Sequence, residues 1–147
     1  MARLGYFVVC EDVQPVTNKE NAIIQALINP LLAVQLPFLP TTYTLAFSLG
    51  ITDIAGDGPY QLKIEISNKE SGEIAYELSD TLMPPKEMLD SLEKSESDLV
   101  FFQLGGPLKN ILFKSTGKYE IKVYFENVEI ANYPIKVSSL EGGKAHV

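Results

Sequence analysis

Few side chains of this 147-residue chain have the chemistry that nucleophilic catalysis requires. His146 is the only histidine and stands second from the end, and Cys10 is the only cysteine. A Ser-His-Asp or Cys-His arrangement would need the end of the chain to fold back rigidly into a site. Glu11 and Asp12 follow Cys10 directly, and their negative charges oppose formation of a thiolate. The sequence therefore predicts no catalytic nucleophile and no enzyme.

Metal ligands would have to come from carboxylates, because zinc sites need several Cys or His residues. Asp53, Asp57 and Asp80 could gather around a calcium ion at the loop end of a β-sandwich. Their spacing matches no calcium-binding loop, and aspartate is a common turn residue. We therefore expect turns at these positions and predict neither a metal nor a cofactor.

Two further patterns have structural explanations. Paired carboxylates could serve a glycosidase, but most acids here alternate along predicted strands or lie on the polar face of a predicted helix, which is typical of a solvated surface. A glycine-rich phosphate loop would be followed by a helix carrying Lys and Ser or Thr, and Gly105-Gly106-Pro107 lacks that context. It indicates a break between two strand segments.

Charge and composition limit the classes of partner. The formal net charge is -7, so phosphate backbones and anionic lipid surfaces would repel the chain, and we predict neither a nucleic-acid nor a membrane partner. The 46% of apolar residues is enough for a packed core. The short apolar stretch before Glu11 is no convincing signal peptide, and Cys10 can form no intramolecular disulfide, so we expect a cytoplasmic protein.

The middle and the end of the chain show the alternation that is typical of β-strands. Apolar residues recur at every second position in residues 43–51, 60–66 and 74–78, and again in 119–125. Glu126-Asn127 suits a two-residue turn, after which residues 128–137 return with a change of phase that predicts a bulge near Ala131-Asn132. Pro134 favours an edge position. We expect one domain over residues 1–137 and a flexible tail over 138–147.

Two segments allow other interpretations. Thr17 and Glu20 have the spacing of a helix capping box, so residues 20–28 could form a helix, but we favour a short buried strand there. Residues 84–94 begin with two prolines and place Met88, Leu89 and Leu92 on one face, which predicts a short crossover helix.

The stretch 115–123 is the most informative about the fold. Gly117 can make a turn, Tyr119 follows two positions later, and Ile121 would face the core. This is the pattern of a tyrosine corner, in which the Tyr hydroxyl bonds back to the corner's backbone. We therefore predict an all-β, immunoglobulin-like antiparallel β-sandwich of about seven or eight strands with the one short helix.

The order of these segments resembles that of an uncharacterised bacterial family of small proteins with a predicted immunoglobulin-like sandwich. The resemblance covers most of the chain and rests on residues 7–13, 28–31, 36–40 and 117–119. It implies the fold, but it brings no assigned activity and no catalytic residues.

Apolar residues in a connecting segment suggest a binding surface. Leu36, Phe38 and Leu39 lie between and beside Pro37 and Pro40, which block regular pairing and would expose their neighbours. We predict a non-catalytic interaction module that contacts a protein partner or a second copy through these residues.

The alternative function is a small-molecule carrier or sensor. An apolar ligand would then lie between the sheets, lined by residues such as Phe47, Tyr76 and Phe102.

Overall fold

The computed structural model describes residues 2–21, 23–55, 58–83 and 100–140, and these form strands and no helix. The strands are β1 (Arg3–Thr17), β2 (Ile23–Pro30), β3 (Ala33–Leu36), β4 (Thr41–Ile54), β5 (Tyr60–Asn68), β6 (Ile74–Leu82), β7 (Val100–Phe113), β8 (Gly117–Phe125) and β9 (Val128–Ser139). The all-β prediction is confirmed. The predicted helix at 84–94 lies outside the described residues.

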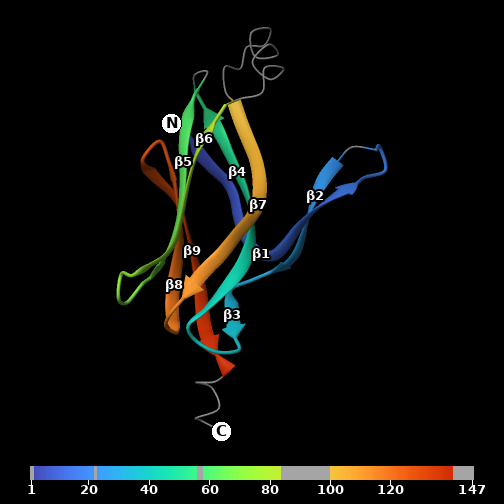
Figure 1. Cartoon of the computed structure of the whole chain (residues 1–147). Helices are drawn as coiled ribbons and strands as arrows, with labels where there is room; N and C mark the ends of the chain where they lie inside the picture. The colour runs from blue at the N-terminus through green and yellow to red at the C-terminus, as the bar shows by residue number, and fades with distance from the viewer. Residues whose placement is uncertain (1, 22, 56–57, 84–99, 141–147) are drawn as a thin grey trace.

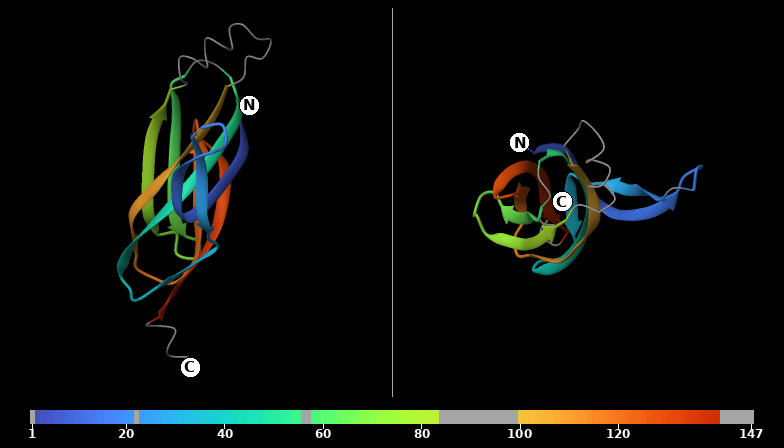
Figure 2. Two further views of the ribbon diagram at one scale, coloured as in Figure 1. Left: turned by 90° about the vertical axis from the view of Figure 1, so that its right-hand side faces the viewer. Right: turned by 90° about the horizontal axis from the view of Figure 1, so that it is seen from above.

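The strands form two sheets that pack face to face as a sandwich (Figures 1 and 2). The four-stranded sheet has the order β2-β1-β4-β7, and the five-stranded sheet has the order β3-β9-β8-β5-β6. All neighbours are antiparallel except β3 and β9, which are parallel. Each sheet turns one set of alternating side chains toward the other, and these sets make the core.

In strand β8 the burial of the side chains follows the alternation of apolar and polar residues in the sequence. Tyr119, Ile121, Val123 and Phe125 are buried in the core, while the residues between them are more exposed. Glu126 and Asn127 have φ values of 51° and 64°, as a tight turn of this kind requires. The predicted strand and turn are therefore both confirmed.

Strand β9 contains the predicted irregularity. Its register with β8 shifts between Ala131 and Glu129, so the bulge lies at Ile130, next to the expected position. Pro134 lies before the stretch that pairs with β3, which begins at Lys136. The strand continues through Ser139, which is 5% exposed, so the sandwich extends beyond the predicted start of the tail at Ser138. Residues 141–147 lie outside the described residues.

Strand β4 is more buried than its alternating pattern predicts. Residues 45–51 are buried on both faces. The inward set joins the core, whereas the outward set is covered by side chains from β1 and β2, which pack against small residues of β4. The alternation in residues 43–51 therefore accounts for only one buried face, because the residues that cover the other face come from β1 and β2.

Candidate functional site

The most distinctive element of the molecule is a two-stranded hairpin that leaves the sandwich. Strand β1 pairs with β4 as far as Cys10, and from Asp12 to Thr17 it pairs with β2 alone. We call residues 11–30 the arm; it projects to the side of the body in Figure 1 and in the view from above in Figure 2. The favoured strand at residues 20–28 is thus confirmed, but it is not buried.

A turn at the tip, rather than a helix cap, explains the polar residues before β2. The side-chain oxygen of Asn18 accepts a hydrogen bond from the Glu20 N–H at 2.9 Å. The backbone carbonyl of Asn18 accepts one from the Asn21 N–H at 3.1 Å. Asn21 has a φ of 62°, which asparagine tolerates better than most residues. These bonds reverse the chain and bring Ile23 opposite Thr17.

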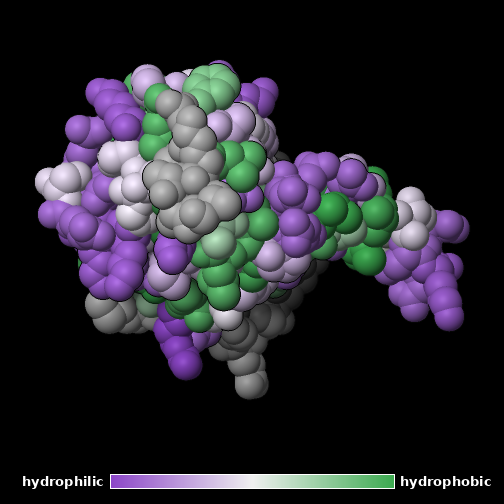
Figure 3. Space-filling model, turned by 90° about the horizontal axis from the view of Figure 1, so that it is seen from below, coloured by the Kyte–Doolittle hydropathy of each residue, from purple (hydrophilic) through white to green (hydrophobic). Residues whose placement is uncertain are grey.

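The arm exposes large apolar side chains. Ile23 is 79% exposed, Ile24 46% and Ile28 40%, and Val16 of the facing strand is 37% exposed. Figure 3 shows apolar surface gathered in the middle of the arm, with polar surface at its tip. Strand β2 contains no charged residue at all. Exposed apolar surface of this kind favours being covered, so the arm is a candidate contact surface.

A groove of about 710 Å³ separates the arm from the outer surface of the four-stranded sheet. We call it the arm groove; its lining includes Val13, Ile23 and Leu27 of the arm and Ser48, Gln103 and Gly105 of the sheet. At its floor the Ser48 hydroxyl, on a residue only 2% exposed, donates to Gln25 Oε1 at 2.8 Å. The hydroxyl of Tyr6 lies 3.4 Å from Ser48 Oγ. These polar contacts hold the middle of the arm, at Gln25, against the sheet.

Two glycines permit this close approach. A Cβ on Gly105 would lie 2.7 Å from the Phe47 carbonyl oxygen and 3.1 Å from Gln25 Nε2. A Cβ on Gly50 would lie 2.4 Å from the ring of Tyr6. The floor of the arm groove therefore depends on residues without side chains.

Of the two residues considered for nucleophilic chemistry, Cys10 lies within the described residues. Cys10 is fully buried, with its Sγ 3.8 Å from the Ala46 carbonyl oxygen. Burial raises the pKa of the Cys10 thiol above its ordinary value, and this opposes thiolate formation. His146 lies outside the described residues.

Two of the three aspartates considered for calcium are engaged in local contacts. Asp53 forms an ion pair with Arg3 at 3.7 Å, and Asp80 Oδ1 accepts the N–H of Thr81 at 2.8 Å. Asp57 lies outside the described residues. Among the described residues, no group of three or more His, Cys, Asp or Glu side chains could hold a metal ion.

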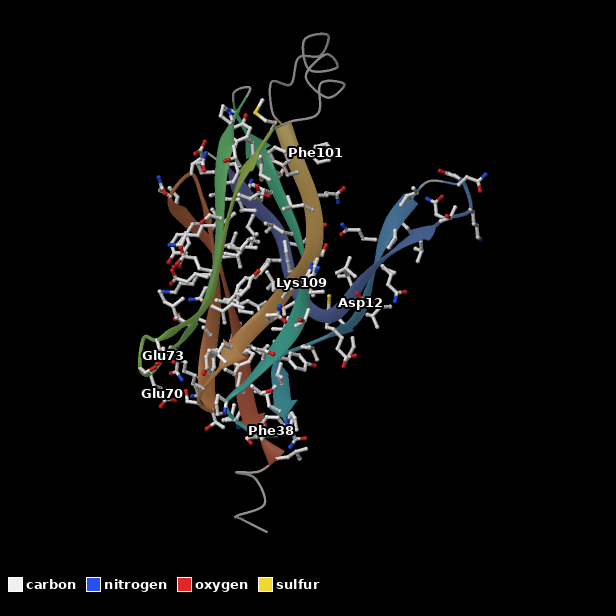
Figure 4. All side chains as sticks on the ribbon, in the orientation of Figure 1. Asp12, Phe38, Glu70, Glu73, Phe101 and Lys109 are labelled. Carbon is white, nitrogen blue, oxygen red and sulfur yellow. The ribbon has the colours of Figure 1, made fainter. Side chains whose placement is uncertain are left out.

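The three predicted interface residues lie in different environments. Leu36 is fully buried on β3, Leu39 packs against the core, and Phe38 is 52% exposed. Figure 4 shows Phe38 at the end of the sandwich near β3. The expectation that the prolines expose all three was wrong, because β3 pairs with β9 and turns Leu36 inward.

The aromatic residues considered for a ligand between the sheets belong to the packed interior or its margin. The rings of Phe47 and Phe7 are 6.3 Å apart, and those of Phe102 and Tyr60 are 5.8 Å apart. Tyr76 lies on the edge strand β6 and packs against the core cluster.

The corner at the start of β8 is closed by hydrogen bonds. Tyr119, which is 3% exposed, donates from its hydroxyl to the Ser115 carbonyl oxygen at 2.8 Å. Gly117 has a φ of 133°, which side chains rarely tolerate. The ring of Tyr119 meets the ring of Phe113 edge-on at 5.2 Å. The corner therefore joins a core ring to the turn that precedes β8.

Replacing Tyr119 with Phe tests the value of this bond. The ring packing survives and the Ser115 carbonyl loses a donor, so we expect the free energy of unfolding to fall by about 1 kcal/mol. Urea unfolding of both proteins measures the difference. Tyr124→Phe, on the outward side of the same strand, is the control and should change little. An unaltered midpoint for Tyr119→Phe would contradict the corner's role.

The fold and the arm define this protein as a two-layer β-sandwich with a projecting hairpin. The chain belongs to the family described as "Family of unknown function (DUF6941)", which matches residues 5–138. No curated protein matches the chain in sequence. Within the described residues, no helix has the length and apolar character that a membrane span requires.

A solved structure with a similar fold is the alkylpurine DNA glycosylase AlkC of Pseudomonas fluorescens, bound to DNA containing an abasic-site analogue. The TM-score is 0.50 and the sequence identity 6%, over 93% of this chain and 30% of that one. This chain therefore spans less than a third of the glycosylase, and the likeness concerns the fold alone.

Proposed function

We propose that the protein is a non-catalytic interaction module that pairs the free edge of β2 with a strand of another chain. One observation carries the proposal: β2 is an eight-residue edge strand without a charged residue, and it stands on an arm away from the body. An open edge offers unpaired N–H and C=O groups to an incoming strand. The exposed isoleucines add apolar contact.

The other sheet edges of the described structure have features that oppose such pairing. Strand β3 has four residues, β6 carries Glu77 and Asp80, and β7 carries Pro107 and Lys109. Short length, charge and proline are the usual protections of an edge strand. Strand β2 has only Pro30, at its last position, so β2 is the edge best suited to accept a strand.

A second copy of this chain is the occupant that the charges favour. Two-fold antiparallel pairing sets a strand against its own copy, so a charge near the middle of the strand would be brought close to the same charge on the partner. Strand β2 carries none, although the whole chain has a net charge of -7. Pairing would also cover Ile24 and Ile28, which are 46% and 40% exposed. We therefore expect a symmetric dimer through β2.

Substitution of Ile24 by Lys tests this assembly. Each copy would bring one new positive charge to the shared edge, so we expect dimerisation to weaken about tenfold or more, measured by light scattering over a range of concentrations. The control is Ile74→Lys, because Ile74 is 53% exposed on β6, a different edge. It should leave the dimer intact.

Two results would overturn the proposed assembly. The first is a wild-type protein that stays monomeric at all concentrations. The second is equal weakening by both substitutions, which would place the contact elsewhere or attribute it to net charge. Slower amide exchange in β2 at high protein concentration would locate the contact directly.

The proposal includes an immunoglobulin-like classification and a cytoplasmic location. The bond from Tyr119 to Ser115 supports the classification, and the lone Cys10 agrees with a reducing compartment. The DNA bound by the glycosylase is no guide to the ligand here, because a net charge of -7 repels a phosphate backbone.

A further inference from the structure

Three lysines gather beside a groove on the opposite side of the sandwich from the arm. The groove has a volume of about 560 Å³ and lies along the outer surface of β8 and β9. We call it the lysine groove; its lining includes Leu32, Lys69, Lys118, Asn132, Pro134 and Lys136. All three lysines are exposed.

The fold forces these charges together. Lys118 of β8 and Lys136 of β9 are direct partners in the strand register, and both point outward because their neighbours Tyr119 and Ile135 face the core. The N–H of Lys69 donates to the Lys118 carbonyl oxygen at 2.8 Å, which brings the third lysine beside them. Like charges directly opposite each other destabilise a sheet. The cluster therefore weakens the fold unless something neutralises it.

Other lysines of the same sheet are neutralised within the chain. Lys63 pairs with Glu65 and Glu77 at 3.4 and 3.8 Å. Lys122 pairs with Glu120 and Glu129 at 3.7 and 3.8 Å. The pKa of Lys122 is raised by Glu120 above all. At these two positions, glutamates of the same sheet balance the charge of the lysine.

The three lysines of the groove lack such partners. In the described part of the chain, no carboxylate lies within ion-pair distance of Lys69, Lys118 or Lys136. Glu120 also lines the groove, but it is already held by Lys122 and by Asn132, whose Nδ2 donates to it at 3.1 Å. Glu70 lies near Gly117 at the corner without pairing with any of the three. The groove therefore has a local excess of positive charge on an acidic protein.

Apolar surface lies next to this charge. Pro134 is the register partner of Glu120 and is exposed, and Leu32, which lines the same groove, is 66% exposed. The Leu32 carbonyl accepts the N–H of Lys136 at 3.0 Å, which fixes its backbone next to the cluster. A ligand that fits must combine negative charge with an apolar group.

We propose that the lysine groove binds an acidic, extended peptide segment of a partner protein, with carboxylates set between the lysines and an apolar side chain on Pro134 and Leu32. The site goes beyond the proposed function, because it lies on the five-stranded sheet and does not use β2. A peptide suits the groove because an extended chain turns every second side chain to the same face, so an acidic residue and an apolar residue two positions apart can both enter the groove.

The test uses a fluorescent peptide that repeats Glu-Ser-Leu-Ser, because this spacing places glutamate and leucine on the same face of an extended chain. Binding is followed by anisotropy. Lys118→Glu should weaken binding about tenfold, and raising KCl from about 50 to about 300 mM should weaken wild-type binding strongly. Lys109→Glu is the matched control, because it changes the net charge equally on β7 of the other sheet (Figure 4). It should alter the affinity by less than about twofold.

A second variant separates lost binding from lost folding. Lys136→Gln removes one charge of the opposed pair, so it should weaken the peptide about threefold while raising the urea midpoint of the free protein. The Ile24→Lys variant should bind the peptide with the affinity of the wild-type protein, because Ile24 lies outside the lysine groove. The peptide site and the β2 contact are therefore tested independently. Equal losses with Lys118→Glu and Lys109→Glu, or tighter binding of inorganic polyphosphate than of the peptide, would overturn the assignment.

Discussion

Replacing Leu36 with Ala is expected to lower the free energy of unfolding by about 2–5 kcal/mol. Leu36 is fully buried between the two sheets although it stands beside Pro37. Its removal leaves a cavity that the paired strands β3 and β9 cannot easily close. Chemical denaturation followed by far-ultraviolet circular dichroism measures the change.

Phe38→Ala provides the contrast in the same segment. Its ring is 52% exposed, so the expected change in stability is within about 0.5 kcal/mol. A similar loss for both variants would mean that Phe38 is part of the core. Little loss for Leu36→Ala would mean that β3 does not dock as described.

Gly105→Ala is expected to destabilise the protein by about 1–3 kcal/mol and to disturb the contact of the arm with the sheet at Gln25. The new Cβ would lie 2.7 Å from the Phe47 carbonyl oxygen, which belongs to the backbone of β4 and cannot rotate away. Strands β4 and β7 would have to separate at this point. The added methyl would also push Gln25, which Ser48 holds through its 2.8 Å hydrogen bond.

The next residue is a matched control. A Cβ on Gly106 would meet nothing within 4 Å, so Gly106→Ala should be neutral or slightly stabilising. Thermal unfolding compares the two variants, and amide exchange in β2 reports on the arm. Equal stability of the two proteins would show that β4 and β7 can relax around a methyl group.

The sequence pattern predicts those parts of the fold in which burial alternates along a single strand. Strand β8 was predicted because its inward residues are all apolar or aromatic, whereas Lys118, Glu120 and Lys122 on its outward side are charged. Leu36 was misplaced because its burial depends on pairing with β9, about a hundred residues away. The alternation of Val34 and Leu36 with Ala33 and Gln35 fits a short strand, but it does not identify β9 as the partner.

The candidate site was harder to predict than the fold. Ile23 and Ile24 are apolar, which normally indicates burial, yet both are exposed on the arm. A signal was present in Asn18 and Asn21, whose turn reverses the chain, but the spacing of Thr17 and Glu20 also suits a helix cap. The lysine groove could not be read from sequence, because strand register brings Lys118 opposite Lys136.

The continuity of β1 has a consequence for any partner. One strand of 15 residues runs through the sandwich and out into the arm, so no linker separates them. A chain bound at β2 would therefore take its orientation from the body, and little conformational entropy would be lost in aligning it. A partner that reached both the arm and the lysine groove would meet them at a fixed spacing. The effective concentration at the second site would then depend on how well the distance between the partner's two binding segments matches this fixed spacing.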